Sequence, residues 1–171
     1  MNVSELDLQT VLFKYSSKGI ILDTNVFLLY LIGVYDQNFI SNCGRLNKFD
    51  KADFSILCSF LKHFTKILTT PQILSELSNL SLAEIKQPKL AMYLKDFVKV
   101  LKDSREEYIH KDILVANPLV YKFGLTDLSI FESAHKNKCM VLTEDFDLYT
   151  YLINNKCIAI NFNHLSFWDL N

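Results

Sequence analysis

Four acidic residues carry the chemistry that this sequence suggests. Asp23 ends the apolar run GIILD, Glu76 lies in TPQILSELSNL, Asp127 in FGLTDLSIFESA and Asp145 in MVLTEDFDLYTYL. Carboxylates brought within a few ångströms of one another repel and resist ionisation. A fold tolerates such a cluster mainly when a hard divalent cation, such as Mg²⁺ or Mn²⁺, binds the carboxylate oxygens. The four acids therefore indicate a divalent-metal site and, through it, phosphate chemistry.

Each acid also has an ordinary explanation. Asp127 and Asp145 stand where helices begin, and a carboxylate there accepts hydrogen bonds from free backbone N–H groups. Glu76 fits a solvated helix face. Asp23 is harder to explain in this way, because it ends an otherwise apolar strand and is followed at once by Thr-Asn. All four explanations would have to hold together to remove the site, so the set is stronger than its members.

Cysteine and histidine spacing gives no sign of a zinc site. The chain has no CxxC pair, and its four histidines are scattered, so each fits an ordinary surface or core residue. We interpret the four cysteines as small buried side chains in a reducing compartment. These residues are Cys43, Cys58, Cys139, Cys157, His63, His110, His135 and His164.

Hydrophobic patterning predicts an α/β fold. Short apolar runs at 19–23, 66–70, 139–143 and 157–160 predict strands, and helical patterns lie between them. Alternation of this kind favours a three-layer α/β/α arrangement around a mostly parallel sheet of about four strands. With 171 residues, half of them apolar, and only 4 Gly and 3 Pro, the chain fits one domain over residues 1–171. Residues 1–18 form a helical extension of it.

The predicted topology brings the acids toward one edge of the sheet. In parallel sheets of this class, ligands bind at the carboxyl ends of the strands. Asp23 ends the first strand, Glu76 is on the helix that leaves the second, and Asp145 follows the third. Asp127 begins the helix that feeds the third strand, so topology alone places it least securely. We expect the first three carboxylates to converge.

Several elements are predicted with definite bounds. A capping box of Ser4 and Asp7 opens a helix to Tyr15, and the helix after Asp23 stops near Gly33. Residues 34–50 read as a loop with a partial helix. Thr70 caps a helix that starts at Pro71 and runs to about Leu80. Further helices are expected from Pro88, over 105–116 and from Thr126, and residues 162–170 are expected to form a final turn or short helix.

The motifs around the acids resemble those of the PIN-domain ribonucleases. The matching residues are the strand into Asp23-Thr24-Asn25, Glu76 in P-x-x-x-x-E, Asp127 in L-T-D, and Thr143-Glu144-Asp145-Phe146-Asp147 after a strand. The resemblance covers roughly residues 19 to 162. The stretch between Asp23 and Glu76 is longer than in the small bacterial toxins of this family, and a helix precedes the first strand.

The resemblance implies a metal-dependent endoribonuclease. Its metal site would contain Asp23, Glu76, Asp127 and Asp145, with Asp147 as a fifth acid. In our hypothesis the three aspartates hold Mg²⁺ or Mn²⁺ directly, and Glu76 is a ligand or orients the attacking water. The resemblance further implies that Asn25 and Thr143 are supporting polar residues, and that products carry 5′-phosphate and 3′-hydroxyl ends. Toxins of this family pair as dimers and are silenced by an antitoxin, so a homodimer and an antitoxin are the implied protein partners.

RNA requires basic side chains, and one helix offers a row of them. Lys95, Lys99 and Lys102 recur at helical spacing beside an apolar face, and they form either a phosphate track or a solvated face. The net charge of −1 argues against a protein that grips nucleic acid over its whole surface. No signal-peptide core opens the chain, and no apolar run reaches the roughly 18 residues that a membrane span needs. We therefore expect a cytoplasmic protein without a membrane partner.

Two other functions fit the pattern less well. A haloacid-dehalogenase-like phosphatase is also a magnesium enzyme of α/β type, but it needs Asp-x-Asp after its first strand, where this chain has Asn25. A non-catalytic PIN-like module would bind RNA or protein, and the retained acids argue against it. A dinucleotide site is disfavoured because GxGxxG follows none of the predicted strands.

Overall fold

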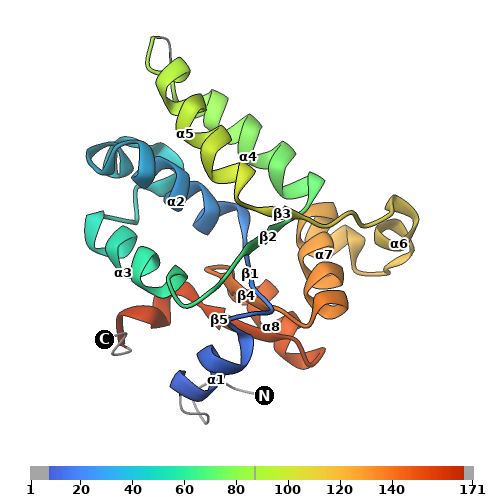
Figure 1. The fold of residues 1–171 in the computed structure, drawn as a ribbon. Helices are drawn as coiled ribbons and strands as arrows, with labels where there is room; N and C mark the ends of the chain where they lie inside the picture. The colour runs from blue at the N-terminus through green and yellow to red at the C-terminus, as the bar shows by residue number, and fades with distance from the viewer. Residues whose placement is uncertain (1–7, 87, 168–171) are drawn as a thin grey trace.

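A five-stranded parallel sheet runs through the computed structural model, which describes residues 8–86 and 88–167 (Figure 1). The strands lie in the spatial order β3-β2-β1-β4-β5, and each neighbouring pair is parallel. Their bounds are β1 Ile20–Leu22, β2 Ile67–Thr69, β3 Arg105–Glu106, β4 Met140–Thr143 and β5 Ile158–Asn161. The α/β/α class predicted from the sequence is confirmed, with one strand more than expected.

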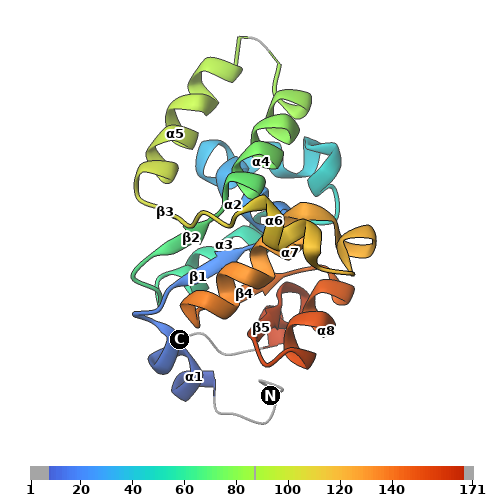
Figure 2. The same cartoon turned by 90° about the vertical axis from the view of Figure 1, so that its right-hand side faces the viewer.

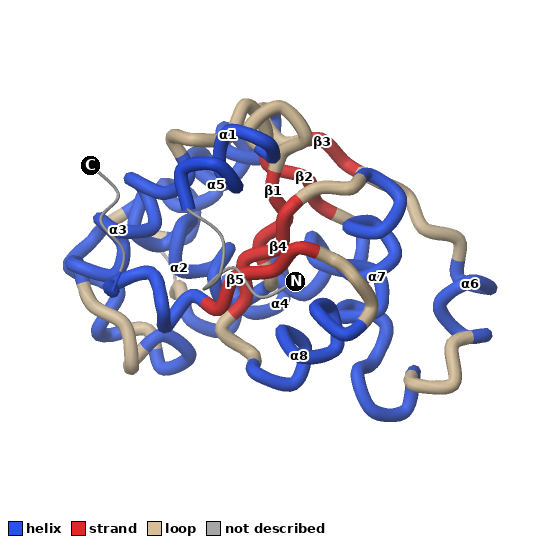
Figure 3. Tube along the Cα trace, turned by 90° about the horizontal axis from the view of Figure 1, so that it is seen from below, coloured by secondary structure: helices blue, strands red, loops and turns tan. Residues whose placement is uncertain are grey.

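Helices cover both faces of this sheet. Helices α2 and α3 lie on one side and α7 and α8 on the other (Figures 1 and 3), while α4 and α5 project away from it (Figure 2). The α-helices are α1 Leu8–Tyr15, α2 Thr24–Tyr35, α3 Lys51–Leu61, α4 Pro71–Glu84, α5 Leu90–Lys102, α6 Lys111–Ala116, α7 Val120–Asn137 and α8 Phe146–Asn154. Short 3₁₀ segments are η2 Gln37–Asn42, η3 Gly44–Leu46 and η4 Phe162–Phe167.

Burial on both faces explains the short apolar runs that predicted the strands. Every residue of β1 and β4 is buried, and β5 is buried except at its first residue. Each fully buried Leu, Ile or Val contributes about 1.5–3 kcal/mol relative to the exposed side chain. The central strands β1 and β4 are therefore held firmly, and the residues that follow them are fixed in position.

Gly33 lies near the end of helix α2 but does not end it. The helix continues to Tyr35, and the ring of Phe54 in α3 packs directly against Gly33. A Cβ at this position would lie 2.2 Å from Phe54 Cδ2. Glycine is therefore needed for close helix packing here. The helix ends near Gly33, as predicted, but its C-cap is Asp36.

The segment 105–116 was predicted to be helical throughout, and this is wrong for its first part. Arg105–Glu106 form β3, which pairs with β2 at the edge of the sheet, and only Lys111–Ala116 is helical. Both β3 residues are exposed and charged, so no apolar alternation marks the strand. Charged side chains on a short edge strand discourage pairing with other molecules.

Other predicted bounds differ by a few residues. Helix α4 extends past Leu80 to Glu84, and α5 begins at Leu90, just after Pro88. The 34–50 segment contains two 3₁₀ turns, and the final turn is the 3₁₀ segment η4. The capping box of Ser4 and Asp7, like the end of the tail at 168–170, lies outside the described residues. No helix in the described residues is both long and apolar enough to cross a lipid bilayer.

Candidate active site

The order of the strands leaves a crevice beside the central strand. From β1 the chain adds β2 and β3 on one side, then crosses over to place β4 and β5 on the other. Where the direction of winding changes in such sheets, the connections at the carboxyl ends separate and leave room for a ligand. Asp23 follows β1 directly, and Asp145 comes two residues after the end of β4. These two acids therefore flank the crevice.

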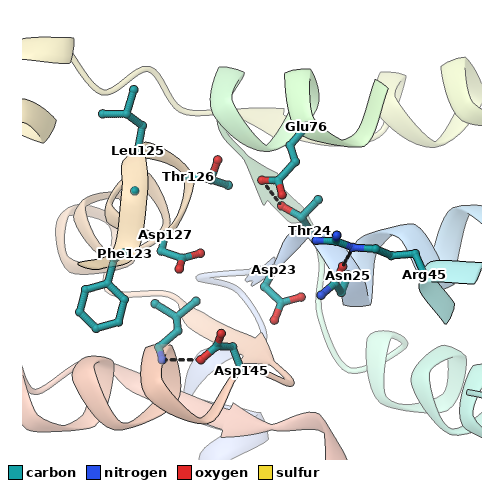
Figure 4. A pocket seen from close by; sticks show the side chains of 12 residues that line it. Asp23, Thr24, Asn25, Arg45, Glu76, Phe123, Leu125, Thr126, Asp127 and Asp145 are labelled. Atoms are coloured by element: carbon teal, nitrogen blue, oxygen red, sulfur yellow. Dashed lines mark hydrogen bonds between the residues drawn. The ribbon is translucent and has the colours of Figure 1, made fainter. Parts of the chain in front are cut away.

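A cleft of about 400 Å³ occupies this crevice, and all four predicted acids line it (Figure 4). Helix α4 supplies Glu76 and α7 supplies Asp127. The structure thus brings the three topologically expected acids together, and it adds Asp127, which topology alone did not place. The other lining residues are Thr24, Asn25, Arg45, Phe123, Gly124, Leu125, Thr126 and Leu148.

Asp23 is the most enclosed of these acids, with 5% of its surface exposed. Its Oδ1 accepts a hydrogen bond from Val26 N at 2.9 Å and so caps α2. Its Oδ2 accepts from Glu144 N at 2.9 Å and from the Thr143 hydroxyl. Burial raises the pKa of Asp23 to about 6, although these donors favour the ionised form. Asp23 is therefore a rigidly held carboxylate whose charge is costly to bury.

Asp127 is the acid with the least compensation. Within the described residues, no hydrogen bond reaches its carboxylate. Burial, followed by the charges of Asp145, Asp23 and Glu76, raises the pKa of Asp127 to about 7. A carboxylate in such surroundings requires either a proton or a nearby cation. The cleft is thus electrostatically unfavourable for four negative charges alone.

Hydrogen bonds fix the remaining two acids. The Thr24 hydroxyl donates to Glu76 Oε2 at 3.1 Å. Asp145 Oδ1 accepts from Leu148 N at 2.9 Å and so caps α8. Capping and lining the cleft are therefore not alternatives, since Asp23 and Asp145 do both.

Thr143 connects the two strand ends on which these aspartates stand. Its hydroxyl donates to Asp23 Oδ2 and accepts from Asp145 N at 3.0 Å. Thr143 is fully buried, so these bonds are shielded from water. Thr143, which we expected to be a supporting residue, thus sets the position of Asp23 relative to the start of α8.

The donor set of the cleft suits a hard cation. Among the described residues, no three Asp, Glu, His or Cys side chains lie close enough together to form a ready-made metal cage. Mg²⁺ does not require one, because it usually takes one or two carboxylates directly and retains several waters. Four carboxylates around a cleft of about 400 Å³, with no His or Cys among the lining residues, fit that mode of binding better than a zinc site.

A second polar network borders the acids. Asn25 Nδ2 donates to Glu144 Oε1 at 2.8 Å, and Asn25 Oδ1 accepts from Arg45 Nε at 3.0 Å. Glu144 is nearly buried and forms an ion pair with Lys48. Asn25 was predicted to be a supporting residue, but Arg45 was not predicted. Arg45 lies in a segment without periodic patterning. The sequence signals for it were its charge and its place between the apolar residues Cys43 and Leu46, which the structure shows to be fully buried.

One wall of the cleft is apolar. Phe123 and Leu125 line it opposite Arg45 in the view of Figure 4, and the Phe123 ring stacks on Tyr151 with centroids 4.8 Å apart. Gly124, which lies between Phe123 and Leu125 in the chain, adopts φ 73° and ψ −177° and interrupts the helical conformation of α7. This backbone conformation is essentially restricted to glycine. The break agrees with the helix start predicted near Thr126, but the apolar wall that it creates was not predicted.

Other predicted site residues lie outside the cleft lining. Asp147 is in the first turn of α8, and its exposed carboxylate pairs with Lys122 at 3.5 Å. Successive residues on a helix point in directions about 100° apart, so a residue two positions after the cap Asp145 faces elsewhere. Lys95, Lys99 and Lys102 are exposed on α5, and none of them lines the cleft.

Comparisons with known proteins add little to this picture. No protein-family model matches the chain, and no curated protein matches it. A solved structure, a domain of a functionally unknown protein from Methanocaldococcus jannaschii DSM 2661, is similar over 85% of this chain and 91% of that chain. Its sequence identity is 17% and its TM-score is 0.40. A likeness at this level supports no inference about function.

Proposed function

We propose that this protein is a Mg²⁺- or Mn²⁺-dependent endoribonuclease that hydrolyses RNA phosphodiester bonds in the acidic cleft, in the manner of the PIN-domain family. The observation that carries the proposal is the state of Asp127. Its carboxylate has no hydrogen-bond donor within the described residues and lines the cleft with the three other acids. Burial, followed by the charges of Asp145, Asp23 and Glu76, raises the pKa of Asp127 to about 7. A divalent cation would compensate these charges.

The residues divide into ligands and positioning groups. Asp127, Asp145 and Asp23 would hold the cation, which when bound neutralises phosphate charge and lowers the pKa of a water molecule. Glu76, fixed by the Thr24 hydroxyl, is placed to orient the attacking water. Thr143 keeps Asp23 aligned with the start of α8. Because these groups are held before substrate arrives, little reorganisation is needed for reaction.

The residue two positions after Asp23 argues against the phosphatase alternative. That family needs a second aspartate at this position, where this chain has Asn25. The Asn25 amide cannot act as an acid, and it is engaged by Glu144 and Arg45.

The apolar wall supports a nucleic-acid substrate over a small phosphoester. Phe123 and Leu125 lie beside the acids and offer a surface on which an unpaired base can pack. A small phosphoester without an apolar or aromatic group would gain nothing from contact with this wall. Binding limited to this cleft is also consistent with a net charge of only −1.

A cleavage assay tests the proposal. The protein is incubated with end-labelled single-stranded RNA in Mg²⁺, in Mn²⁺ and in EDTA, and compared with Asp127→Asn and a control, Asp112→Asn. Asp112 is an exposed helix residue outside the cleft. We expect cleavage only with metal, a loss of about 10²–10³-fold in Asp127→Asn, and the parent rate in the control.

Two results would contradict the proposal. One is the absence of cleavage by the parent protein with either metal, and the other is a parental rate in Asp127→Asn. Tight RNA binding without metal-dependent turnover would favour the non-catalytic module instead. Release of phosphate from small phosphoesters, without RNA cleavage, would favour the phosphatase.

The cellular setting that we propose is the cytoplasm. All four cysteines are free thiols, which agrees with a reducing compartment. The resemblance also implies an antitoxin or a second copy of the chain as partner. Expression in a bacterial host separates the biological roles, because a toxin arrests growth and Asp127→Asn abolishes the arrest, whereas a processing enzyme leaves growth unchanged.

A further inference from the structure

One basic side chain stands in the acidic cleft without neutralising any of its acids. Among the described residues that line the cleft, Arg45 is the only basic one. In the described part of the chain, no carboxylate lies within 4.0 Å of its guanidinium nitrogens. Lys48 and Lys122 behave differently, since they pair with Glu144 and Asp147. The positive charge of Arg45 therefore remains available to another group.

The guanidinium is nevertheless held in place. Its Nε donates to Asn25 Oδ1 at 3.0 Å, and Asn25 is anchored in turn by Glu144 at 2.8 Å. The preceding residue, Gly44, donates its backbone N–H to Glu84 Oε2 at 2.9 Å, which ties the η3 turn to α4. Cys43, just before the η3 turn, and Leu46, its last residue, are both fully buried. Arg45 thus projects from a rigid support.

These features suit the recognition of a phosphate. Arginine carries five N–H donors, and the bond to Asn25 uses one, which leaves those of the two Nη groups. Two such donors match two oxygens of one phosphate, and a guanidinium fixed in advance loses less conformational freedom on binding. A neutral amide as anchor keeps the charge undiminished, whereas a carboxylate anchor would cancel it.

We propose that Arg45 is a substrate-binding residue that contacts a phosphate of the substrate strand at the side of the cleft opposite Phe123 and Leu125. Asn25 holds Arg45 by its Nε and so directs the Nη groups toward that phosphate. The strand would then cross the acids between a phosphate contact and an apolar base contact (Figure 4). This inference rests on the proposed function for the identity of the strand.

The test measures binding with cleavage suppressed. In a Glu76→Gln background with Mg²⁺, which keeps the three aspartates proposed to hold the cation, the affinity for a fluorescein-labelled single-stranded RNA of about ten nucleotides is measured by anisotropy at several salt concentrations. The variants Arg45→Gln and Arg45→Lys are compared with Lys62→Gln. Lys62 is exposed at the end of α3, outside the cleft, so that control changes the net charge equally.

We expect Arg45→Gln to weaken binding about tenfold and to reduce the salt slope by about 0.7. Arg45→Lys should regain part of the affinity, and Lys62→Gln should match the background. In the cleaving enzyme, Arg45→Gln should raise KM more than it lowers kcat. A purely structural role would instead lower the thermal midpoint and leave the salt slope unchanged.

Three results overturn the inference: no RNA binding by the background protein, a salt slope unchanged in Arg45→Gln, or an equal loss in Lys62→Gln. The proposed nuclease activity and the proposed phosphate contact of Arg45 can be refuted independently. If the parent protein cleaves RNA while Arg45→Gln binds it normally, only the phosphate contact is refuted. If nothing is cleaved but Arg45→Gln still loses affinity and salt slope, the phosphate contact stands and the nuclease is refuted.

Discussion

Replacing Asp127 with asparagine should stabilise the metal-free protein while it abolishes activity. The substitution preserves the size of the side chain and removes a charge that burial and three neighbouring acids oppose. No described residue donates a hydrogen bond to this carboxylate, so few native interactions are lost. The charge of Asp127 lowers the stability of the folded protein, yet the residue lines the cleft. Such a loss of stability is expected at sites where selection favours function.

The size of the effect follows from the pKa of Asp127. Burial and the neighbouring acids raise the pKa of Asp127 from its ordinary value of 3.8 to about 7 in the folded protein. At about 1.4 kcal/mol per pKa unit, the carboxylate costs up to about 4 kcal/mol when ionised. Water in the cleft relaxes part of this cost, so a gain of about 2–4 kcal/mol is expected in Asp127→Asn.

The raised pKa of Asp127 also determines how the free energy of unfolding of the parent protein changes with pH. Between about pH 4 and pH 7 the folded state binds more protons at Asp127 than the unfolded state does, because its pKa is raised. The free energy of unfolding of the parent protein therefore falls as pH rises through this range. The advantage of Asp127→Asn should be small at about pH 4, grow with pH, and level off above about pH 7.

Urea unfolding in EDTA at several pH values measures this difference. Asp112→Asn serves as the matched control and should shift stability by less than about 0.5 kcal/mol, since Asp112 is an exposed helix residue. Mg²⁺ at about 100 times its dissociation constant should restore about 2.7 kcal/mol to the parent and less to Asp127→Asn. A variant no more stable than the parent at about pH 8 in EDTA would refute the argument that the cleft is electrostatically strained.

Two further predictions concern the metal and the apolar wall. The apparent affinity for Mn²⁺, measured by calorimetry, should rise up to about tenfold per pH unit below about pH 7 and then level off, because the cation displaces a proton from Asp127. A Mn²⁺ affinity that does not change with pH would show that Asp127 is not a ligand. Gly124→Ala should destabilise the protein by about 1–3 kcal/mol, because alanine is strained at φ 73°. A Cβ there would meet no atom within 4 Å, so backbone strain is the only expected cost. Gly44→Ala, where a Cβ would make ordinary contact with Glu84 at 3.6 Å, is the control in urea unfolding, and an equal loss in both would contradict this reason.

The sequence predicted the placement of the acids for a physical reason. Buried strands of a parallel sheet read as short apolar runs, and the residues that follow them must meet at one edge. Asp23 and Asp145 could be placed in this way, and Glu76 by its position on the next helix. Asp127 stands before its strand, so topology alone placed it least securely.

Other features depend on packing that no local pattern reveals. Gly33 looked like a helix stop, but its role depends on Phe54 of another helix. The β3 strand consists of two exposed charged residues, which carry no strand signal. Arg45 enters the cleft because the η3 turn is fixed by burial of Cys43 and Leu46. Phe123 faces the cleft because Gly124 interrupts α7.

Anomalous scattering from crystals of the protein soaked in Mn²⁺ would show whether the cleft binds a divalent cation. We expect a manganese peak in the cleft within coordination distance of at least one of Asp23, Asp127 and Asp145, and no such peak in Asp127→Asn at the same Mn²⁺ concentration. A cleft without manganese in the parent protein, or manganese bound only at other carboxylates, would contradict the proposed metal site.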